Sequence, residues 1–377
     1  MKVLRILAVL AFLVFSLPSL YLMAQDTDTV SSLGTDNKTV EDSGDITAET
    51  YDGVDIKLKG GAVKKIKLET IKGNITYRDE TRDYINARQL LEAGKYTQAI
   101  ESYKKALADA RLRAIFKQHV LFNIAVCYHN AKQFDDAMQA YDEVLKAFEK
   151  TRYFKQVYFN KSDCAAKKPA PDLKMALDIL DDAKVKGRDI GEKFLLEVDL
   201  RKANLLEDSN KPDEAKAIYN RLKTSAAMQP AILYRAIIGL GRVELAGNEL
   251  GKAEEAFNEV IERSDDAVAK AGAYNGKGDC LMANPKADYK TLKNALFSYL
   301  RSKLLYPAPA GETTIEEEKA IYNAGLSCEK LAQALPQEKK KVYINNAKLL
   351  YQELKQKFPG SRFVPEANKR LSELGGK

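Results

Sequence analysis

Histidine is the side chain best suited to metal binding and to proton transfer near neutral pH, and the sequence contains only two, His119 and His129. They are ten residues apart, so on one helix they would point in different directions. No His-Glu-x-x-His spacing, typical of zinc-dependent hydrolases, is present. The sequence therefore predicts that each histidine is a surface or groove residue and that the protein has no metal site.

Two stretches that contain glycine and lysine look superficially like phosphate-binding loops. They are GNELGKA, which starts at Gly247, and GAYNGKG, which starts at Gly272. Neither has the Gly-x-x-x-x-Gly-Lys-Ser/Thr spacing that lets backbone N–H groups surround a phosphate. There is also no Gly-x-Ser-x-Gly nucleophile motif, and the carboxylates are scattered along the chain. We therefore predict no catalytic residue, no cofactor and no enzymatic activity.

Residues 1–24 have the pattern of a secretory signal. Two basic residues precede an apolar run from Ile6 to Leu17, and small residues mark a cleavage site after Ala24. Cleavage at this site predicts an exported, periplasmic protein. The apolar stretch is also about long enough to span a bilayer, so an uncleaved segment that anchors the protein to the inner membrane is the alternative.

The charge of the chain argues against nucleic-acid binding. The formal net charge is +7, and +5 without Lys2 and Arg5 of the signal. Lysine and glutamate are interspersed along the helical part, which favours a solvated surface of mixed charge over a nucleic-acid footprint. Apolar residues make up 45% of the chain, which is enough for a packed core over most of its length.

The four cysteines of an exported chain raise the question of disulfides. Their spacings match no metal-binding motif, and each falls within a different predicted helix. Cysteine in such a position is usually a small buried apolar residue. Free, buried thiols are therefore favoured over disulfides for Cys127, Cys164, Cys280 and Cys328.

Ahead of the helical part, the sequence changes to a strand pattern. Residues 25–38 are polar and could hold one strand at TVSSL, and residues 39–78 contain alternating apolar and charged residues between glycine-containing turns. This alternation predicts four or five short antiparallel strands. A sheet this small must curl into a barrel or cover its edges on a neighbour. The pattern resembles the SH3-like or Sm-like β modules found ahead of helical repeats in some exported bacterial proteins.

From about residue 80 to the end, one pattern occurs seven times. A small residue is followed four positions later by a large, mostly aromatic residue and seven positions later by a mostly apolar one, as in Ala99, Tyr103 and Ala106. The other copies start at Ala137, Ala176, Ala215, Ala253, Ala295 and Ala347. A second small residue comes twelve positions before each of the first five anchors, beginning with Ala87. Each copy is therefore predicted to contain two packed helices.

This register resembles the tetratricopeptide repeat (TPR), which has a small residue in its first helix, helix A, and Ala, an aromatic and a small residue in its second, helix B. Pro307 and Pro359 stand where the family places its closing proline, and Leu240-Gly241 matches its Leu-Gly pair. The resemblance covers residues 80–360. It implies a mainly α protein with a right-handed solenoid of about seven helix pairs.

The end of the chain carries a second resemblance. Residues 361–377 are predicted to form a short capping helix, which begins at Pro365, and a tail. The segment that leads into it, YQELKQKFPGSRFVPEANKRLSEL, resembles the terminal repeats of cell-envelope TPR proteins. These include outer-membrane assembly lipoproteins and the periplasmic Tol-Pal accessory protein, so the resemblance implies a cell-envelope location.

The TPR resemblance also implies a binding groove, because the A helices line the concave face of such a solenoid. The groove positions that follow by register are Tyr84, Arg88, Leu91, His119, Asn123, Val126, His129, Asn130, Asn204, Arg235 and Arg242. Tyr84 and Arg88 stand where the family's carboxylate clamp has Lys and Asn, so recognition of chaperone tails is not expected.

Two functions remain open from the sequence. The first is a non-enzymatic exported scaffold or adaptor that binds a protein or an extended peptide of the cell envelope through the groove. The second is a structural component of a cell-envelope complex that is tethered through its N-terminal region. Neither function involves nucleic acid.

Overall fold

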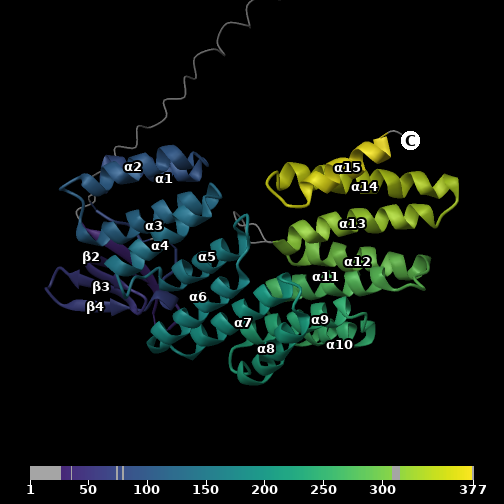
Figure 1. Cartoon of the computed structure of the whole chain (residues 1–377), viewed down its shortest axis with the longest axis horizontal. Coiled ribbons are helices and arrows are strands. Elements are labelled where there is room, and N and C mark those ends of the chain that lie inside the picture. Colours follow the sequence, from purple (N-terminus) through teal and green to yellow (C-terminus); the bar gives the residue numbers. More distant parts are fainter. Residues whose placement is uncertain (1–26, 35, 74, 79, 308–314, 376–377) are drawn as a thin grey trace, which may run out of the picture. The chain divides into compact units, whose positions relative to one another are not determined.

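The computed structural model describes residues 27–34, 36–73, 75–78, 80–307 and 315–375. It is mainly α-helical, with a small antiparallel sheet near the N-terminus (Figure 1). The chain divides into an N-terminal unit, Met1–Cys164, and a C-terminal unit, Ala165–Lys377. The predicted signal of residues 1–24 lies outside the described residues.

The sheet of the N-terminal unit is a four-stranded antiparallel meander in the order β1-β2-β3-β4. Its strands are β1 (Asp28–Leu33), β2 (Thr39–Thr50), β3 (Gly53–Leu58) and β4 (Val63–Ile66), and a 3-10 helix, η1 (Leu68–Thr70), follows. The expected strand at TVSSL is thus β1, and it pairs with β2. Two isolated bridges, Thr29 to Thr76 and Ser32 to Ile71, cover the free edge of β1. A small antiparallel sheet is therefore confirmed, while its likeness to SH3 or Sm barrels stays a prediction.

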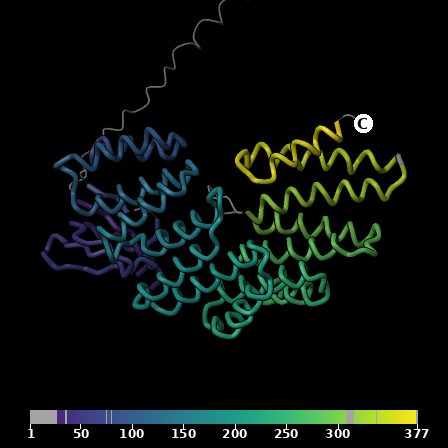
Figure 2. Tube along the Cα trace, viewed as in Figure 1, coloured from purple at the N-terminus to yellow at the C-terminus, as the bar shows by residue number. Residues whose placement is uncertain are grey.

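The sheet hides its apolar face against the helices. Val30, Ile46, Val54 and Ile56 are at most 3% exposed, and β2 contacts α3. At the far end of the β2–β3 hairpin, Tyr51 N donates to the Lys150 carbonyl, 3.1 Å away, in the loop that follows α4. The strands, purple in Figure 2, are therefore part of the N-terminal unit and not a separate module.

Fifteen α-helices follow the sheet within the described residues, and the first fourteen alternate as helix A and helix B of seven pairs, as predicted. They are α1 (Arg82–Glu92), α2 (Tyr96–Ala108), α3 (Ala114–Asn130), α4 (Phe134–Ala147), α5 (Phe154–Lys167), α6 (Leu173–Lys186), α7 (Glu192–Asp208), α8 (Pro212–Ser225), α9 (Pro230–Ala246), α10 (Leu250–Arg263), α11 (Ala267–Ala283), α12 (Tyr289–Leu305), α13 (Ile315–Gln333), α14 (Gln337–Lys357) and α15 (Val364–Gly375), with a 3-10 helix η2 (Arg188–Ile190) before α7. The boundary between the two units lies within α5. Within each unit, neighbouring helices stack in the manner of a solenoid, as Figure 1 shows for α11 to α14.

The repeated residues form the core of these pairs. All seven anchor alanines, from Ala99 to Ala347, are fully buried, and the large residue four positions after each is at most 1% exposed. The third position of the pattern, from Ala106 to Leu354, is equally buried. Ala367 and Leu374 of α15 close the last core cluster, which agrees with the predicted capping helix. The repeated spacing therefore identifies the contact between helix A and helix B.

The turn between helix A and helix B has its own repeated geometry. Five positions before the buried alanine, Gly94, Lys132, Asn210 and Asn248 all have left-handed backbone, with φ between 58° and 71°. Glycine and asparagine tolerate this conformation, whereas a lysine Cβ approaches the next carbonyl oxygen. Lys132 is therefore a strained position in an otherwise favourable series.

Replacing Lys132 with glycine is expected to stabilise the N-terminal unit by about 1 kcal/mol, because the left-handed turn is then free of this clash. Urea unfolding followed by circular dichroism measures the change. The control is Lys104→Gly within α2, where the same substitution should destabilise by about 1 kcal/mol. A Lys132→Gly protein that loses stability would contradict the assignment of strain.

Candidate functional site

The first helices of the C-terminal pairs build one continuous surface. Helices α7, α9, α11 and α13 contact one another in chain order. At Gly272 of α11, a side-chain Cβ would lie 3.4 Å from Ile238 Cδ1 on α9 and 3.5 Å from Glu316 Cδ on α13. Small residues thus let three A helices converge. We call the solvent side of these four helices the A face.

Arg242 lies on this face and is held by its neighbours. Its Nε is 2.6 Å from Glu207 Oε1, and its Nη2 is 2.8 Å from Glu207 Oε2. The Tyr219 hydroxyl of α8 lies 2.7 Å from Glu207 Oε2 and 2.7 Å from Asn204 Oδ1, and it can donate its proton to either. Burial would lower the pKa of Arg242, but the hydrogen bonds and the charge of Glu207 raise it. The Glu207–Arg242 ion pair therefore joins α7 to α9, and the Tyr219 hydroxyl joins α8 to both.

A second cluster joins the next two pairs in the same way. Asp279 of α11 accepts from Tyr299 of α12 at 2.7 Å, from Lys319 of α13 at 2.6 Å and from Asn323 of α13 at 3.0 Å. As in the first cluster, the hydroxyl of a helix B tyrosine lies among polar groups of two A helices. These side chains stabilise the stacking of the pairs, so they are not free to bind a ligand without breaking it.

Arg235 differs from the other predicted groove residues of the C-terminal unit. It is exposed on α9, and no carboxylate of the described residues pairs with it. Asn204 and Arg242, by contrast, belong to the Glu207 cluster. Of the three, Arg235 is thus the side chain on the A face that can pair with an incoming acidic or carbonyl group.

In the first helix pair, the predicted groove residues are largely engaged as well. Tyr84 is 5% exposed, and its ring lies 5.1 Å from that of Phe116. Burial raises the pKa of Tyr84 to about 12. Arg88 forms a two-point ion pair with Glu80, 2.9 and 3.1 Å long, and Leu91 is half-buried beside the core.

The predicted groove residues of α3 are brought together on one helix but differ in access. Asn123, Val126 and His129 are half-buried, and Asn130 is exposed. His129 Nδ1 lies 3.5 Å from the hydroxyl of Tyr141, the helix B tyrosine of the same pair. His129 therefore takes the position that Glu207 occupies beside Tyr219.

His119 corrects the sequence prediction, because it is not at a surface or in a groove. It is 3% exposed, its Nε2 lies 2.9 Å from Glu49 Oε2, and its Nδ1 lies 2.5 Å from the Tyr153 hydroxyl. Glu49 is on β2, so the sheet covers this end of α3. The N-terminal end of the predicted groove is therefore filled by the protein's own strand.

Glu49 is the centre of a buried network that sequence reasoning missed. Tyr77 donates to its Oε1 at 2.5 Å, and Arg152 Nη1 is 3.2 Å from its Oε2. Burial would raise the pKa of Glu49, but its hydrogen bond and ion pair with His119 and the charge of Arg152 lower it. The network fixes the sheet to α3 and to the loop before α5.

Comparison with known protein families identifies the type of repeat that these helix pairs form. A sequence model of the tetratricopeptide repeat matches residues 90–157, which contain α2, α3 and α4, and the buried register found there continues through α14. The chain contains tetratricopeptide repeats. No curated protein sequence matches this TPR protein.

Solved TPR structures resemble it in part. A tetratricopeptide repeat protein from Parabacteroides merdae is 14% identical with a TM-score of 0.49, over 78% of this chain and 100% of the other. The C-terminal part of a TPR repeat-containing protein from Cytophaga hutchinsonii is 13% identical with a TM-score of 0.40, over 75% and 98%. PilW, a type IV pilus biogenesis factor, is 14% identical with a TM-score of 0.40, over 66% and 97%.

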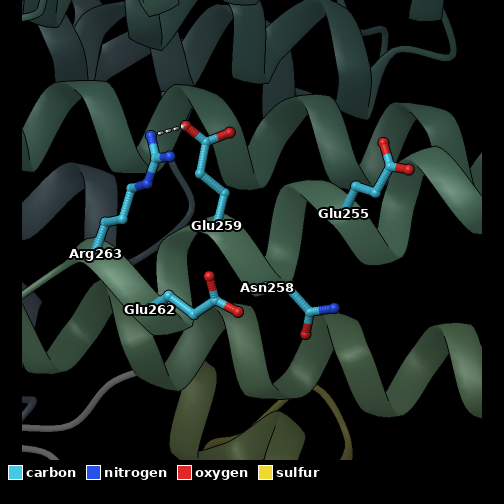
Figure 3. A pocket seen from close by; sticks show the side chains of 5 residues that line it. All are labelled: Glu255, Asn258, Glu259, Glu262 and Arg263. Carbon is cyan, nitrogen blue, oxygen red and sulfur yellow. Dashed lines mark ion pairs between the residues drawn. The ribbon is translucent and has the colours of Figure 1, made fainter.

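A polar hollow of about 330 Å³ lies on the B helix α10 (Figure 3). Glu255, Asn258, Glu259, Glu262 and Arg263 line it, and Arg263 pairs with Glu259 at 3.6 Å. All five residues come from one helix, so the hollow is an open depression in the surface. It does not enclose a substrate.

The thiols do not supply chemistry either. Cys127, Cys164, Cys280 and Cys328 are free and buried, as the sequence predicted. Burial raises the pKa of Cys127, Cys280 and Cys328 to about 12, so these thiols stay protonated and unreactive at neutral pH. Within the described ranges, no three His, Cys, Asp or Glu side chains are grouped as metal ligands. Over the same ranges, no helix has the length and hydropathy needed to span a membrane.

Proposed function

We propose that this TPR protein is a non-enzymatic scaffold or adaptor that binds a protein or an extended peptide along the A face of the C-terminal unit. The observation that carries the proposal is the direct contact of α7, α9, α11 and α13, which makes one surface out of four repeated helices. A repeated surface suits an extended polypeptide, because similar contacts recur along it. The proposal includes export to the cell envelope, which rests on the signal pattern of residues 1–24.

Whether each polar side chain on the A face is paired or unpaired determines its role in binding. The Glu207–Arg242 and Asp279–Lys319 pairs keep the helices in register before a partner arrives, which lowers the ordering cost of binding. Arg235 is unpaired within the described residues and supplies the charged contact. We therefore expect the partner segment to carry a carboxylate or to expose backbone carbonyls near α9.

Arg235→Ala is expected to weaken partner binding by about tenfold while unfolding changes by less than about 0.5 kcal/mol. Arg242→Ala is the matched control, because it removes an arginine from the same helix. It should lower stability by about 1–3 kcal/mol, since it leaves Glu207 without its ion pair. Titration of a purified partner, with urea unfolding of each variant, measures both effects. Equal affinity for wild type and Arg235→Ala would contradict the proposal.

The structural alternative, a tether through the N-terminal region, needs a gentler test than deletion of residues 25–78. Such a deletion would remove Asp28 and Glu49, the buried partners of Arg113, His119 and Arg152. The first helix pairs would then be left with uncompensated buried charge. Exchange of exposed sheet residues, such as Val63→Ser on β4, keeps this network intact. Loss of assembly in that variant, with unchanged binding at Arg235, would favour the tether.

A further inference from the structure

The outer side of the last helix pairs carries an unusual share of exposed apolar residues. Six of the 13 large apolar side chains that are exposed within the described residues lie on only two helices, α12 and α14. They are Tyr289, Phe297, Leu304, Leu305, Val342 and Leu349. Such a concentration marks an interaction surface more often than scattered single residues do.

On α12 these residues alternate with positive charge. Lys290, Phe297 and Leu304 are seven residues apart, so they follow one stripe, and Lys293 and Arg301 flank it. The Lys293 ammonium lies 5.6 Å from the centre of the Phe297 ring. The helix contains no Asp or Glu. The outer side of α12 is therefore both apolar and positively charged.

Exposed apolar and basic residues continue on α14, which also contains Glu338 and Glu353. Val342 and Leu349 are seven residues apart, and Lys341, Lys348 and Lys355 form a parallel stripe beside them. No carboxylate of the described residues pairs with these three lysines. Their charge is thus available to a partner.

The two helices lie together in the outer layer of the C-terminal unit. The Tyr289 hydroxyl of α12 is 3.0 Å from that of Tyr343 on α14, and Lys303 Nζ is 2.6 Å from Glu353 Oε2. These contacts join both ends of α12 to α14. We call the combined surface, the exposed sides of α12 and α14, the basic-apolar face.

The neighbouring outer surface has the opposite charge. On α10, Glu255 and Glu262 are exposed and line the hollow together with Glu259, which pairs with Lys223 and Arg263 (Figure 3). An anionic surface would be repelled by α10 and attracted by α12 and α14. The charges of the C-terminal unit therefore favour an orientation in which α12 and α14, and not α10, face an anionic surface.

We infer that the basic-apolar face docks on an anionic lipid bilayer. The basic side chains can pair with the anionic headgroups, and the exposed Phe, Leu and Val side chains between them can enter the upper acyl region. The long lysine side chains can reach the headgroups while their methylene groups cover apolar surface. This docking would leave the A face, on the other helix layer, open to a protein partner.

A bilayer fits the geometry better than an acidic amphipathic helix. A helix docks its apolar side into a groove, which hides the apolar residues that receive it. Here Phe297 is 44% exposed, and Leu304 and Leu349 are 66% and 61% exposed, so these side chains project from the tops of their helices. Projecting side chains are suited to insertion between lipid headgroups.

Co-sedimentation of the full chain with vesicles tests the inference. Vesicles of equal parts phosphatidylcholine and phosphatidylglycerol should bind wild-type protein, and Lys341→Glu/Lys355→Glu should weaken this binding by about tenfold or more. The control is Lys104→Glu/Lys105→Glu on α2, which has the same change in charge and should bind like wild type. Phe297→Ser/Leu304→Ser should also weaken binding. Residues 1–26 are the same in all variants, so a difference between variants reports on the substituted helices.

A fluorescent label locates the contact. An environment-sensitive dye on Asn345→Cys of α14 should shift to the blue when phosphatidylglycerol vesicles are added, whereas the same dye on Asn220→Cys of α8 should not. The four native cysteines are buried and should not compete for the dye. Equal binding of all charge variants, or equal shifts at both positions, would overturn the inference. Binding of polyglutamate in place of vesicles, lost in Lys341→Glu/Lys355→Glu, would also overturn it and assign the face to an acidic polypeptide.

Discussion

Replacing Glu49 with alanine is expected to destabilise the N-terminal unit by about 3–5 kcal/mol, because it removes one partner of a buried charge network. The side chain of Glu49 is fully buried, and that of His119 is 4% exposed. Without the carboxylate, the ring of His119, the guanidinium of Arg152 and the hydroxyl of Tyr77 lose a shared acceptor. Hydrogen exchange of the α3 amides measures the free energy of opening of this unit.

Glu41→Ala on the same strand is the matched control. Glu41 is exposed, so its loss should change the opening free energy by less than about 0.5 kcal/mol. Glu49→Gln should fall between the two, since the amide keeps an acceptor for Tyr77 but not the negative charge. Similar protection of α3 in Glu49→Ala and wild type would show that the network does not hold the sheet to the helices.

The same network makes stability depend on pH. The pKa of Glu49 in the folded protein is below its ordinary value of 4.5, so the unfolded chain binds the proton more readily. The stabilisation is therefore fully present above about pH 4.5 and is lost as the pH falls through the folded pKa. Asp28, paired with Arg113 at 2.7 Å, acts in the same direction. Below pH 4.5, opening of α3 should depend less steeply on pH in Glu49→Gln than in wild type.

Gly276→Ala should lower the stability of the C-terminal unit by about 1–3 kcal/mol or more, because there is no space for a methyl group. A Cβ at this position of α11 would lie 2.3 Å from two ring carbons of Phe257. Phe257 is the fully buried helix B aromatic of the preceding pair, so its ring cannot move without disturbing the core. Thermal unfolding of the C-terminal unit measures the loss.

Gly251→Ala on α10 is the control for the loss of a helical glycine. A Cβ there meets nothing within 4 Å, so alanine should stabilise by about 0.5–1 kcal/mol. Combining Gly276→Ala with Phe257→Leu should restore part of the loss relative to the sum of the two single changes, because the smaller side chain makes room. Strict additivity would mean that the contact is not the cause.

The helix pairs could be predicted from the sequence because their signal is local and repeated. The spacing within the pattern of Ala99, Tyr103 and Ala106 is the same in all seven copies, and each recurrence sets the same contact between helix A and helix B. Spacing of this kind does not depend on distant parts of the chain.

The buried network of Glu49 could not be predicted, because it depends on a strand irregularity and on distant residues. Asp42, Gly44 and Ile46 alternate inward along β2, and continued alternation would point Glu49 outward. The register of β2 against β3 shifts between Ile46 and Ala48, which turns Glu49 inward. Its partner Tyr77 comes 28 positions later in the sequence, and its other two partners, His119 and Arg152, come more than 60 positions later.

The groove residues show a different limit. The TPR register predicted that Arg88, Arg235 and Arg242 all occupy groove positions on A helices. It could not show which of these arginines has an ion-pair partner. Glu80 pairs with Arg88, and Glu207 pairs with Arg242, while Arg235 is unpaired within the described ranges. A pairing across helices depends on the stacking of neighbouring pairs, which the pattern of a single repeat does not contain.

Site-specific photo-crosslinking tests the proposed function most directly. The photoreactive residue p-benzoylphenylalanine is placed at Arg235 on the A face or, as the control, at the exposed Asn220 on α8 of the outer layer. In cells that produce the full chain, we expect a discrete crosslinked protein from position 235 and none from position 220. Mass spectrometry should place the crosslink in an extended segment of that partner. Crosslinking of the same partner from position 220 and not from position 235 would contradict binding along the A face.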